Sequence, residues 1–395
     1  MALGALVGAY QEDDSGGLRA LFPLAGRTLI EYQVRCAAAA GAAPIVLLVD
    51  RIPPALNEAL ERLQREGISV NTVSDGLEAA NRFATGEMIL LIGDGIAPPA
   101  ELLTSIAEEP EPAIVTVPDD TTHQHFERID AVSRWAGVAL VDSHALGATA
   151  AMLGDWDLQS TLLRRTLQAG ALTLPIAPDA GEPVLANKPE ELTALDRQLI
   201  VASRGSRRDW ASRYVLPIVE EYSTEALLNT AVRPERLIEA ALLVTLGSVF
   251  AFASGWLWAG MALLVLSTPL DLVARRLAAL RLRPIPQRSR MRGLLWPAAG
   301  LALLALGWWI SQNGGGWGAS YAALAAAAFA EAARIERGKT ELPGQIWLFS
   351  RRNAIFAAVP FALFGAWTTA IVGVSLYAAG SFFFAQYVNH RLQPS

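Results

Sequence analysis

Residues Ala240–Leu270 read AALLVTLGSVFAFASGWLWAGMALLVLSTPL, a stretch without a single charged side chain. Two further charge-free stretches follow it, Leu294–Ala330 and Ala354–Asn389. Apolar runs longer than about 18 residues are typical of transmembrane helices, because a spanning helix satisfies its backbone hydrogen bonds internally. Three such runs in succession predict that the second half of the chain is an all-α membrane domain.

Each of these runs is long enough for two spans, and turn residues interrupt it near its middle. The breaks fall at Ser254-Gly255, at Ser311–Gly316 and, less distinctly, at Gly365–Trp367. We therefore expect a six-helix transmembrane domain over residues 237–390. The six expected spans are 237–253, 256–273, 294–311, 317–333, 354–368 and 370–388.

Positive charge between the spans indicates their orientation. Arginines without any acid separate spans two and three, and basic residues also separate spans four and five, whereas the opposite connections carry no charge. Because cytoplasmic loops hold the excess of Lys and Arg, we expect both termini in the cytoplasm, in a bacterial inner membrane. Arg275 and Arg276 are also candidates for contact with anionic lipid headgroups.

The first 200 residues alternate between strand-like and helix-like segments. Buried strands are expected at residues 5–8, 44–49 and 88–92, with amphipathic helices at 29–40 and 54–66. This alternation predicts an α/β domain with a doubly wound, mostly parallel sheet. Ligands of such sheets bind beyond the carboxyl ends of the strands, where we expect the loop after Gly8 and the turn around Asp94.

The segment ALVGAYQEDDSGGLRALFPL (residues 5–24) resembles the opening of the nucleotidyltransferases that make NDP-sugars and CDP-alcohols. The resemblance implies that Gly8, Gly16, Gly17 and Arg19 bind a CTP-like nucleoside triphosphate, with Arg19 also catalytic. Asp94 matches the aspartate that holds Mg²⁺ in the family, and residues 185–192 resemble its closing element. A phosphorylated polyol or sugar is the implied second substrate.

Three departures from this family bear on activity. Phe22 occupies the position of the catalytic lysine, Asn187 replaces a second metal-binding aspartate, and the loop contains the acids Glu12–Asp14. Losing a cation and a carboxylate weakens the stabilisation of a transferring phosphate group. Arg27 is a candidate substitute for the lysine. Both an active enzyme and a non-catalytic paralogue that binds nucleotide or lipid remain open.

The membrane half resembles the CDP-alcohol phosphatidyltransferases. Residues 201–236 have the character of that family's amphipathic interfacial helix, and Ala274-Arg275 matches part of its aspartate-rich signature. The four signature aspartates would fall on Ser267, Leu270, Pro297 and Leu301, with Asp271 as the nearest acid. The resemblance therefore implies the fold, and a homodimer through this domain, without the phosphatidyltransferase chemistry.

Composition excludes several other classes of function. The formal net charge of −6 argues against nucleic acid as a partner. Cys36 is the only cysteine, so the chain has neither a disulfide framework nor a cysteine-based metal site. No ionisable residue is expected at the middle of a span, which disfavours an ion-coupled transporter.

Overall fold

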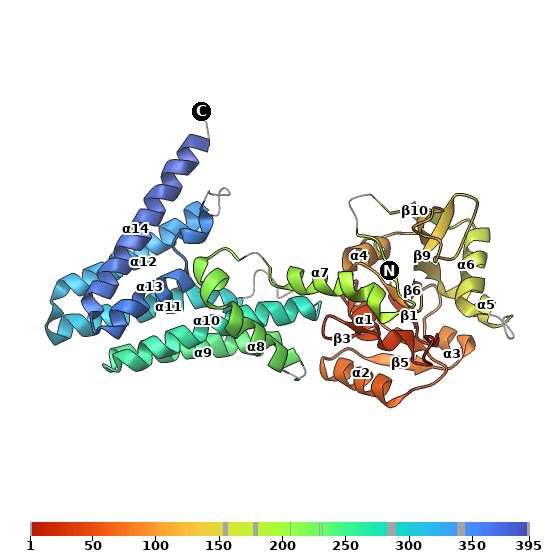
Figure 1. The fold of residues 1–395 in the computed structure, drawn as a ribbon, viewed down its shortest axis with the longest axis horizontal. Helices are drawn as coiled ribbons and strands as arrows, with labels where there is room; N and C mark the ends of the chain where they lie inside the picture. Colours follow the sequence, from red (N-terminus) through yellow and green to blue (C-terminus); the bar gives the residue numbers. More distant parts are fainter. Residues whose placement is uncertain are drawn as a thin grey trace. The chain divides into compact units, whose positions relative to one another are not determined.

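The computed structural model describes residues 2–152, 157–176, 181–205, 207–228, 230, 232–282, 290–337 and 344–392. They form two compact units, which are drawn in Figure 1. The first unit is Met1–Ala202 with Leu280–Arg283, and the second comprises the remainder of the chain.

A seven-stranded sheet forms the centre of the first unit, in the order β10-β8-β9-β6-β1-β4-β5. Its pairs are parallel except for those that β9 makes with β6 and β8. The expectation of a mostly parallel sheet is thus confirmed, with β9 as an antiparallel insertion. The strands are β1 Leu3–Gly8, β4 Ile45–Leu48, β5 Val70–Val73, β6 Met88–Ile92, β8 Ala113–Pro118, β9 Ser133–Asp142 and β10 Leu172–Pro175.

Helices cover both faces of this sheet, as a doubly wound fold requires. Because successive residues of a strand point to opposite faces, Val7 packs in one hydrophobic cluster and Leu6 in another. The cluster of Val7 contains residues of α1 (Leu29–Ala39), α2 (Pro54–Arg65) and α4 (Ala100–Ala107). The cluster of Leu6 contains residues of α3 (Gly76–Ala80), α5 (Ser143–Ala150) and α6 (Leu158–Gln168).

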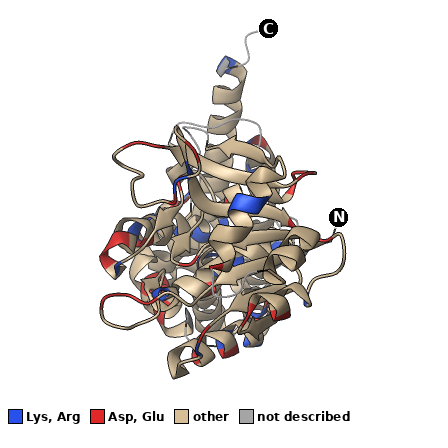
Figure 2. Ribbon diagram, turned by 90° about the vertical axis from the view of Figure 1, so that its right-hand side faces the viewer, with Lys and Arg blue, Asp and Glu red and all other residues tan. Residues whose placement is uncertain are grey.

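Short elements complete the first unit. Two two-stranded ribbons pair β2 with β3 and β7 with β11, and α7 follows the second ribbon. In Figure 2, acidic segments occupy several of the outer loops and helices. The bounds are η1 Arg19–Leu21, β2 Pro23–Leu24, β3 Arg27–Thr28, β7 Ile96–Ala97, β11 Val184–Leu185, η2 Pro189–Leu192 and α7 Thr193–Ser203.

The second unit is entirely helical in the residues described. Six helices, α9 to α14, lie near the positions of the six expected spans, although α13 ends at Leu363, before the expected end of the fifth span at residue 368, and α8 precedes them. The bounds are η3 Ala211–Val215, α8 Pro217–Leu228, α9 Pro234–Ala253, α10 Leu257–Leu280, α11 Arg290–Ile310, η4 Ser311–Gly315, α12 Trp317–Arg337, η5 Gln345–Trp347, α13 Arg351–Leu363 and α14 Trp367–Leu392.

Four helices of the second unit are long and apolar enough to cross a membrane: Pro234–Ala253, Leu257–Leu280, Met291–Gly315 and Trp367–Arg391. The α13 helix has 13 residues. At about 1.5 Å per residue it is shorter than the roughly 30 Å of a bilayer's hydrocarbon core. The α12 helix carries the charged residues Glu331, Arg334, Glu336 and Arg337 toward its C-terminal end, which lower its mean hydropathy. These helices indicate a membrane protein, and the number of spans stays a prediction.

The segment expected as one interfacial helix, residues 201–236, contains two helical pieces, η3 and α8. The exposed side chains of α8 include Ile218 and Tyr222, whereas its polar residues Glu220 and Thr224 are buried. The outward face of α8 therefore carries apolar side chains together with the carboxylates of Glu221 and Glu225.

Candidate functional site

The expected ligand edge of the first unit lies where β1 and β6 end side by side. These two strands pair in parallel, with Val7 opposite Ile92, so the residues that follow them meet at one edge. The Asp94 carboxylate accepts hydrogen bonds through Oδ2 from the backbone nitrogens of Tyr10 at 2.6 Å and Gln11 at 2.7 Å. The loop after Gly8 and the turn containing Asp94 are thus held together.

One oxygen of the Asp94 carboxylate, Oδ1, is buried without a hydrogen-bond partner among the described residues. The residue as a whole is 4% exposed. Burial raises the pKa of the Asp94 carboxyl above its ordinary value, although the N–H groups of Gln11 and Tyr10 act in the opposite direction. A buried carboxylate oxygen without a partner is costly unless a cation or a donor completes it.

Arg19 reaches the same turn. Its Nη1 donates to Gln11 Oε1 at 2.8 Å, and its Nε has no partner among the described residues. Gly95 has a φ of +73°, and a Cβ there would lie 3.5 Å from Arg19 Cδ and 2.9 Å from the carbonyl oxygen of Ala186. Only glycine suits this position, where the Arg19 side chain and the backbone of two segments converge.

The closing element of the resemblance also lies at this turn. Strand β11 pairs with β7, and the backbone nitrogen of Ala186 donates to the carbonyl oxygen of Gly95 at 2.8 Å. Asn187, the residue in the position of the second metal-binding aspartate, therefore follows directly on a contact with the Asp94 turn. Its own backbone nitrogen donates to Glu191 Oε2 at 2.7 Å.

These residues fit a Mg²⁺ ion whose coordination a bound phosphate completes. Asp94 offers its unpartnered Oδ1, and Asn187 follows Ala186, whose backbone nitrogen donates to the carbonyl oxygen of Gly95. Among the described residues no group of three or more His, Cys, Asp or Glu side chains forms a metal cage. Mg²⁺ commonly binds through one or two carboxylates together with water and substrate phosphates.

The amides of the glycine loop face a carboxylate of the chain itself. Asp13 Oδ1 accepts hydrogen bonds from Ser15 N at 2.9 Å, Ser15 Oγ at 2.7 Å and Gly17 N at 2.8 Å. The hydroxyl of Ser15 and the N–H of Gly17 hold the pKa of Asp13 below its ordinary value. Gly16 makes the turn with a φ of +79°. In this structure Asp13 thus occupies amides that the resemblance assigns to a triphosphate.

Two further ion pairs hold the loop, and neither was expected from the sequence. Arg51 Nη2 lies 2.7 Å from Glu12 Oε1 and donates to the carbonyl oxygen of Gly16 at 2.5 Å. Lys188 Nζ lies 3.7 Å from Asp14 Oδ2. Arg51 comes shortly after β4, the neighbour of β1, so its place after a buried strand was an available signal that it belongs to this edge.

At the carboxyl end of β1, the loop begins in close contact with α6. A Cβ on Gly8 would lie 2.6 Å from Gln159 Nε2, so a larger residue at position 8 would displace that side chain. Asp157, the N-cap of α6, lies 3.2 Å from the hydroxyl of Tyr10. Gly8 therefore serves close packing, and Asp157 and Gln159 are additional polar groups near the loop.

Phe22 and Arg27 do not supply the missing cation in this structure. Phe22 is 5% exposed and belongs to the hydrophobic core. Arg27 is buried, and its nearest acid is Glu31, at 3.8 Å. Glu31 also pairs with Arg62 at 3.0 Å and with Arg35 at 3.4 Å, so Arg27 belongs to a charged cluster on α1 and α2. A catalytic role for Arg27 stays a prediction, without a contact to Asp94 in its support.

The two arginines expected at lipid headgroups differ in their surroundings. Arg276 is buried and lies 3.7 Å from Glu220 Oε1 of α8. Arg275 is partly exposed, lies 3.8 Å from Asp271 Oδ2 and lines a separate pocket. Ser267, at the position of a signature aspartate, is buried and donates to the carbonyl oxygen of Leu264 in its own helix.

Solved structures exist that are similar in fold to part of this chain. No family model matches the chain, and no curated protein matches its sequence. A crystal structure described as a glucose-1-phosphate thymidylyltransferase from Bacillus anthracis in complex with sucrose is similar to half of the chain. The similarity covers 50% of this chain and 95% of that one, at 11% identity and a TM-score of 0.39. The function of this chain is therefore argued from its own residues.

Proposed function

We propose that the chain is a membrane-anchored, nucleotidyltransferase-like protein of envelope-lipid metabolism, whose first unit binds a CTP-like nucleoside triphosphate with Mg²⁺. The observation that carries this proposal is the free, buried Oδ1 of Asp94 beside the Arg19 side chain. Both lie at the carboxyl edge of a mostly parallel sheet, where α/β folds bind their ligands.

The reaction that this site would support is nucleotidyl transfer. A phosphate oxygen of a phosphorylated polyol or sugar forms a bond to the α-phosphorus of the nucleotide, and pyrophosphate leaves. The Arg19 guanidinium would neutralise phosphate oxygens, and the backbone at Gly95 allows close approach because it carries no Cβ. Mg²⁺, when bound at Asp94, supplies further positive charge to the phosphates.

Membrane anchoring belongs to the same proposal. The four long apolar helices support it, and α12 and α13 fall where the two remaining spans were expected. We propose six spans with both termini in the cytoplasm of a bacterial inner membrane, and domains at 1–200, 201–236 and 237–390. A homodimer through the membrane domain follows from the family resemblance alone.

A second candidate is a paralogue that binds nucleotide without turning it over. Two observations favour it: Phe22 is buried where a lysine would act, and Asp13 occupies amides of the loop. The membrane half would then be equally silent, since Ser267 bonds within its own helix and the nearby Asp271 is paired with arginine.

Pyrophosphate release separates the two candidates. The full chain, purified in a neutral detergent, is incubated with Mg²⁺, each of the four nucleoside triphosphates and a panel of sugar and polyol phosphates. Mg²⁺-dependent release that Asp94→Asn abolishes supports the transferase. The matched control is Glu111→Gln, an exposed carboxylate changed in the same way after α4.

Absence of turnover combined with calorimetric nucleotide binding, lost in Asp94→Asn, supports the binding protein. Neither turnover nor nucleotide binding in the wild-type chain would refute the proposed function altogether.

A further inference from the structure

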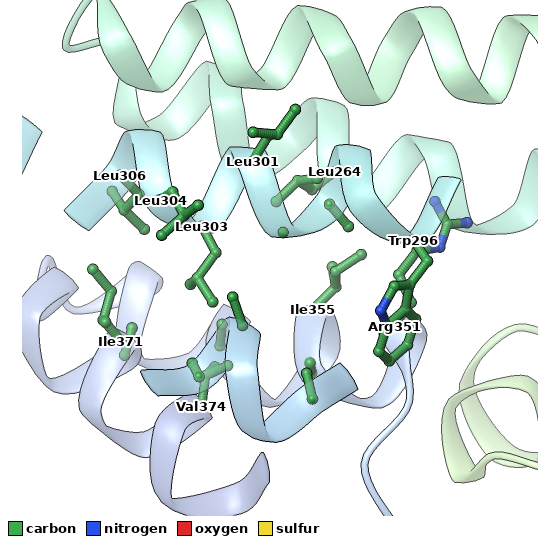
Figure 3. Close-up of a pocket in the computed structure, with 18 of the residues that line it drawn as sticks. Leu264, Trp296, Leu301, Leu303, Leu304, Leu306, Arg351, Ile355, Ile371 and Val374 are labelled. Atoms are coloured by element: carbon green, nitrogen blue, oxygen red, sulfur yellow. The ribbon is translucent and has the colours of Figure 1, made fainter. Parts of the chain in front are cut away.

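Two adjoining pockets lie inside the second unit. The smaller, of about 200 Å³, is lined by charged residues, and the larger, of about 490 Å³, is almost wholly apolar. Trp296 and Arg351 line both pockets, so the two spaces meet at these side chains. Figure 3 shows Trp296 and Arg351 together at one end of the larger cavity, with Leu306 and Ile371 toward the other.

The smaller pocket has an excess of positive charge. Arg275, Arg292, Arg351 and Arg352 line it, against the two carboxylates of Asp209 and Asp271. A single arginine engages both acids: Arg352 Nη1 donates to Asp209 Oδ2 at 2.9 Å, and its Nη2 donates to Asp271 Oδ2. Arg275, Arg292 and Arg351 therefore share these two carboxylates with Arg352, and none of the three has a carboxylate of this pocket as an exclusive partner.

Arg351 is the group in need of a partner. Its side chain is 9% exposed and lies 3.8 Å from Asp271 Oδ2, which is too long for a hydrogen bond. Its Nη1 and Nη2 have no hydrogen-bond partner in the described part of the chain. A buried guanidinium is unfavourable unless an acceptor satisfies it, and its planar fork matches a phosphate group.

The larger pocket suits a hydrocarbon chain. Small residues from two helices, including Gly300 of α11 and Ala326 and Ala327 of α12, leave the space that leucines surround. Its one acid, Glu331, is already paired with Arg334. The volume falls within the roughly 300–1,000 Å³ of small-molecule sites, and water would find few polar partners there.

We propose that the second unit binds one anionic phospholipid, with its phosphate in the arginine pocket and an acyl chain in the apolar cavity. The phosphate would receive hydrogen bonds from Arg351 and charge from Arg275 and Arg292. Binding requires no metal, because Arg352 already engages both carboxylates of the pocket. This inference does not rest on nucleotide binding by the first unit.

The test is native mass spectrometry of the full chain in a neutral detergent, titrated with dioleoyl phosphatidic acid. We expect one lipid bound per chain, unaffected by EDTA. Dioleoylglycerol, which lacks the phosphate, and inorganic phosphate, which lacks the chains, should each bind at least about tenfold more weakly. Equal affinity for inorganic phosphate would overturn the lipid assignment, because it would leave a headgroup site alone.

Substitutions of two arginines test whether phosphatidic acid binds in the arginine pocket. Arg351→Gln should weaken phosphatidic acid binding at least about tenfold, with partial recovery in Arg351→Lys. Arg236→Gln removes an exposed charge from the start of α9 and should change affinity less than about twofold. An equal loss in both glutamine variants would show diffuse surface attraction and refute the pocket.

A cavity variant keeps the proposal falsifiable if Arg351→Gln does not fold. A Cβ at Gly300 meets no heavy atom within 4 Å, so Gly300→Leu adds a side chain to the lining without a clash at that atom. We expect this variant to weaken phosphatidic acid binding several-fold and to leave competition by glycerol phosphate unchanged. Unaltered lipid binding would show that the acyl chain does not enter the cavity.

Discussion

The Asp94 turn of the first unit and the arginine pocket of the second combine the same residue types in opposite proportions. At the Asp94 turn a free carboxylate oxygen stands beside one arginine, and the adjoining loop carries three acids, Glu12–Asp14. In the arginine pocket four guanidinium groups surround two carboxylates whose Oδ2 atoms both accept from Arg352, and Asp271 Oδ1 likewise has no hydrogen-bond partner among the described residues. Both places suit a phosphate, but only the second can neutralise one without a metal ion.

This difference has a physical consequence for how each place responds to its surroundings. A carboxylate loses its charge on protonation and depends on a divalent cation to attract phosphate. Guanidinium stays charged at any pH that a protein tolerates and recognises phosphate directly. Metal, pH and mutation should therefore affect the two places differently, and each of these variables tests the comparison.

The largest difference should come from removing one aspartate at each place. Asp271→Leu leaves Arg352 with one partner fewer and removes the carboxylate that lies 3.8 Å from both Arg351 and Arg275. Breaking a buried pair in this way costs about 3–5 kcal/mol of unfolding free energy. Hydrogen exchange of α10 and α13 in the full chain measures the loss. A loss below about 1 kcal/mol would contradict the buried pairing.

Asp94→Asn should have a much smaller effect on stability. The amide oxygen of asparagine can still accept the N–H groups of Tyr10 and Gln11, so we expect a change within about 1 kcal/mol. Cys36 provides the measurement, because it is the only cysteine, is buried in α1, and burial raises its thiol pKa to about 12. It should react with thiol reagents only when the first unit unfolds.

Removal of metal ions should affect ligand binding at the Asp94 turn and at the arginine pocket differently. With EDTA, nucleotide binding by the full chain should weaken at least about tenfold, equivalent to about 1.4 kcal/mol, whereas phosphatidic acid binding should not change. Calorimetry with a non-hydrolysable nucleotide measures the first, and native mass spectrometry measures the second. The proposed difference is wrong if EDTA weakens the binding of both nucleotide and phosphatidic acid, or if EDTA leaves nucleotide binding unchanged.

Much of the first unit was predictable from short-range pattern. The runs at 44–49 and 88–92 became β4 and β6, and the parallel pairing placed Asp94 beside the loop after Gly8. The antiparallel strand β9 was not predicted: it follows β8 along the chain, but its insertion between β8 and the distant β6 depends on pairing that no local pattern contains. In the membrane half, absence of charge located the helices, but hydropathy alone cannot decide whether α13 crosses a bilayer.

Site details depended on contacts that no pattern contains. The acids of the loop indicated repulsion of phosphate, yet the bonds from Ser15 and Gly17 to Asp13 depend on the positive φ of Gly16. Similarly, Arg352 was interpreted as a determinant of topology. Its pairing with Asp271 joins residues 81 positions apart and follows from the packing of α13 against other helices.

Acidic pH should weaken the nucleotide site before it affects the fold. Burial raises the pKa of Asp94, so the carboxylate takes up a proton at a higher pH than an ordinary aspartate. Protonation competes with Mg²⁺, and one proton exchanged gives at most about a tenfold loss of affinity per pH unit. The folded state itself is favoured, because a raised carboxyl pKa means that folded protein binds the proton more tightly.

Calorimetric titration of nucleotide between pH 7.5 and about 5 checks this expectation. Asp94→Asn is the control, because any pH dependence that it retains comes from other groups, including the terminal phosphate of the nucleotide, whose second pKa is about 6. Phosphatidic acid binding should persist across the same range, because guanidinium groups do not titrate there. A loss of nucleotide binding that Asp94→Asn reproduces with the same pH dependence would remove Asp94 as the cause.

The smallest expected effect is that of Asp13 substitutions on nucleotide affinity. These substitutions separate the effect of the Asp13 charge from the effect of its hydrogen bonds to the loop amides. Asp13→Asn keeps an oxygen that can accept the N–H groups of Ser15 and Gly17 but removes the negative charge. Because an exposed charge acts weakly through water, we expect nucleotide affinity to rise only about threefold, and less at high salt. Asp13→Ala also frees the N–H groups of Ser15 and Gly17. If the triphosphate binds these N–H groups, the alanine variant should bind nucleotide more tightly than the asparagine variant.

Equal affinity of the asparagine and alanine variants would show that the loop amides do not contact the nucleotide. Weaker binding by alanine than by asparagine would show that Asp13 orders a loop the ligand needs. Lowering the pH cannot replace these variants, because the hydrogen bonds from Ser15 and Gly17 hold the pKa of Asp13 below its ordinary value. The acid that opposes phosphate thus stays charged under conditions where Asp94, which would hold the metal, is already protonated.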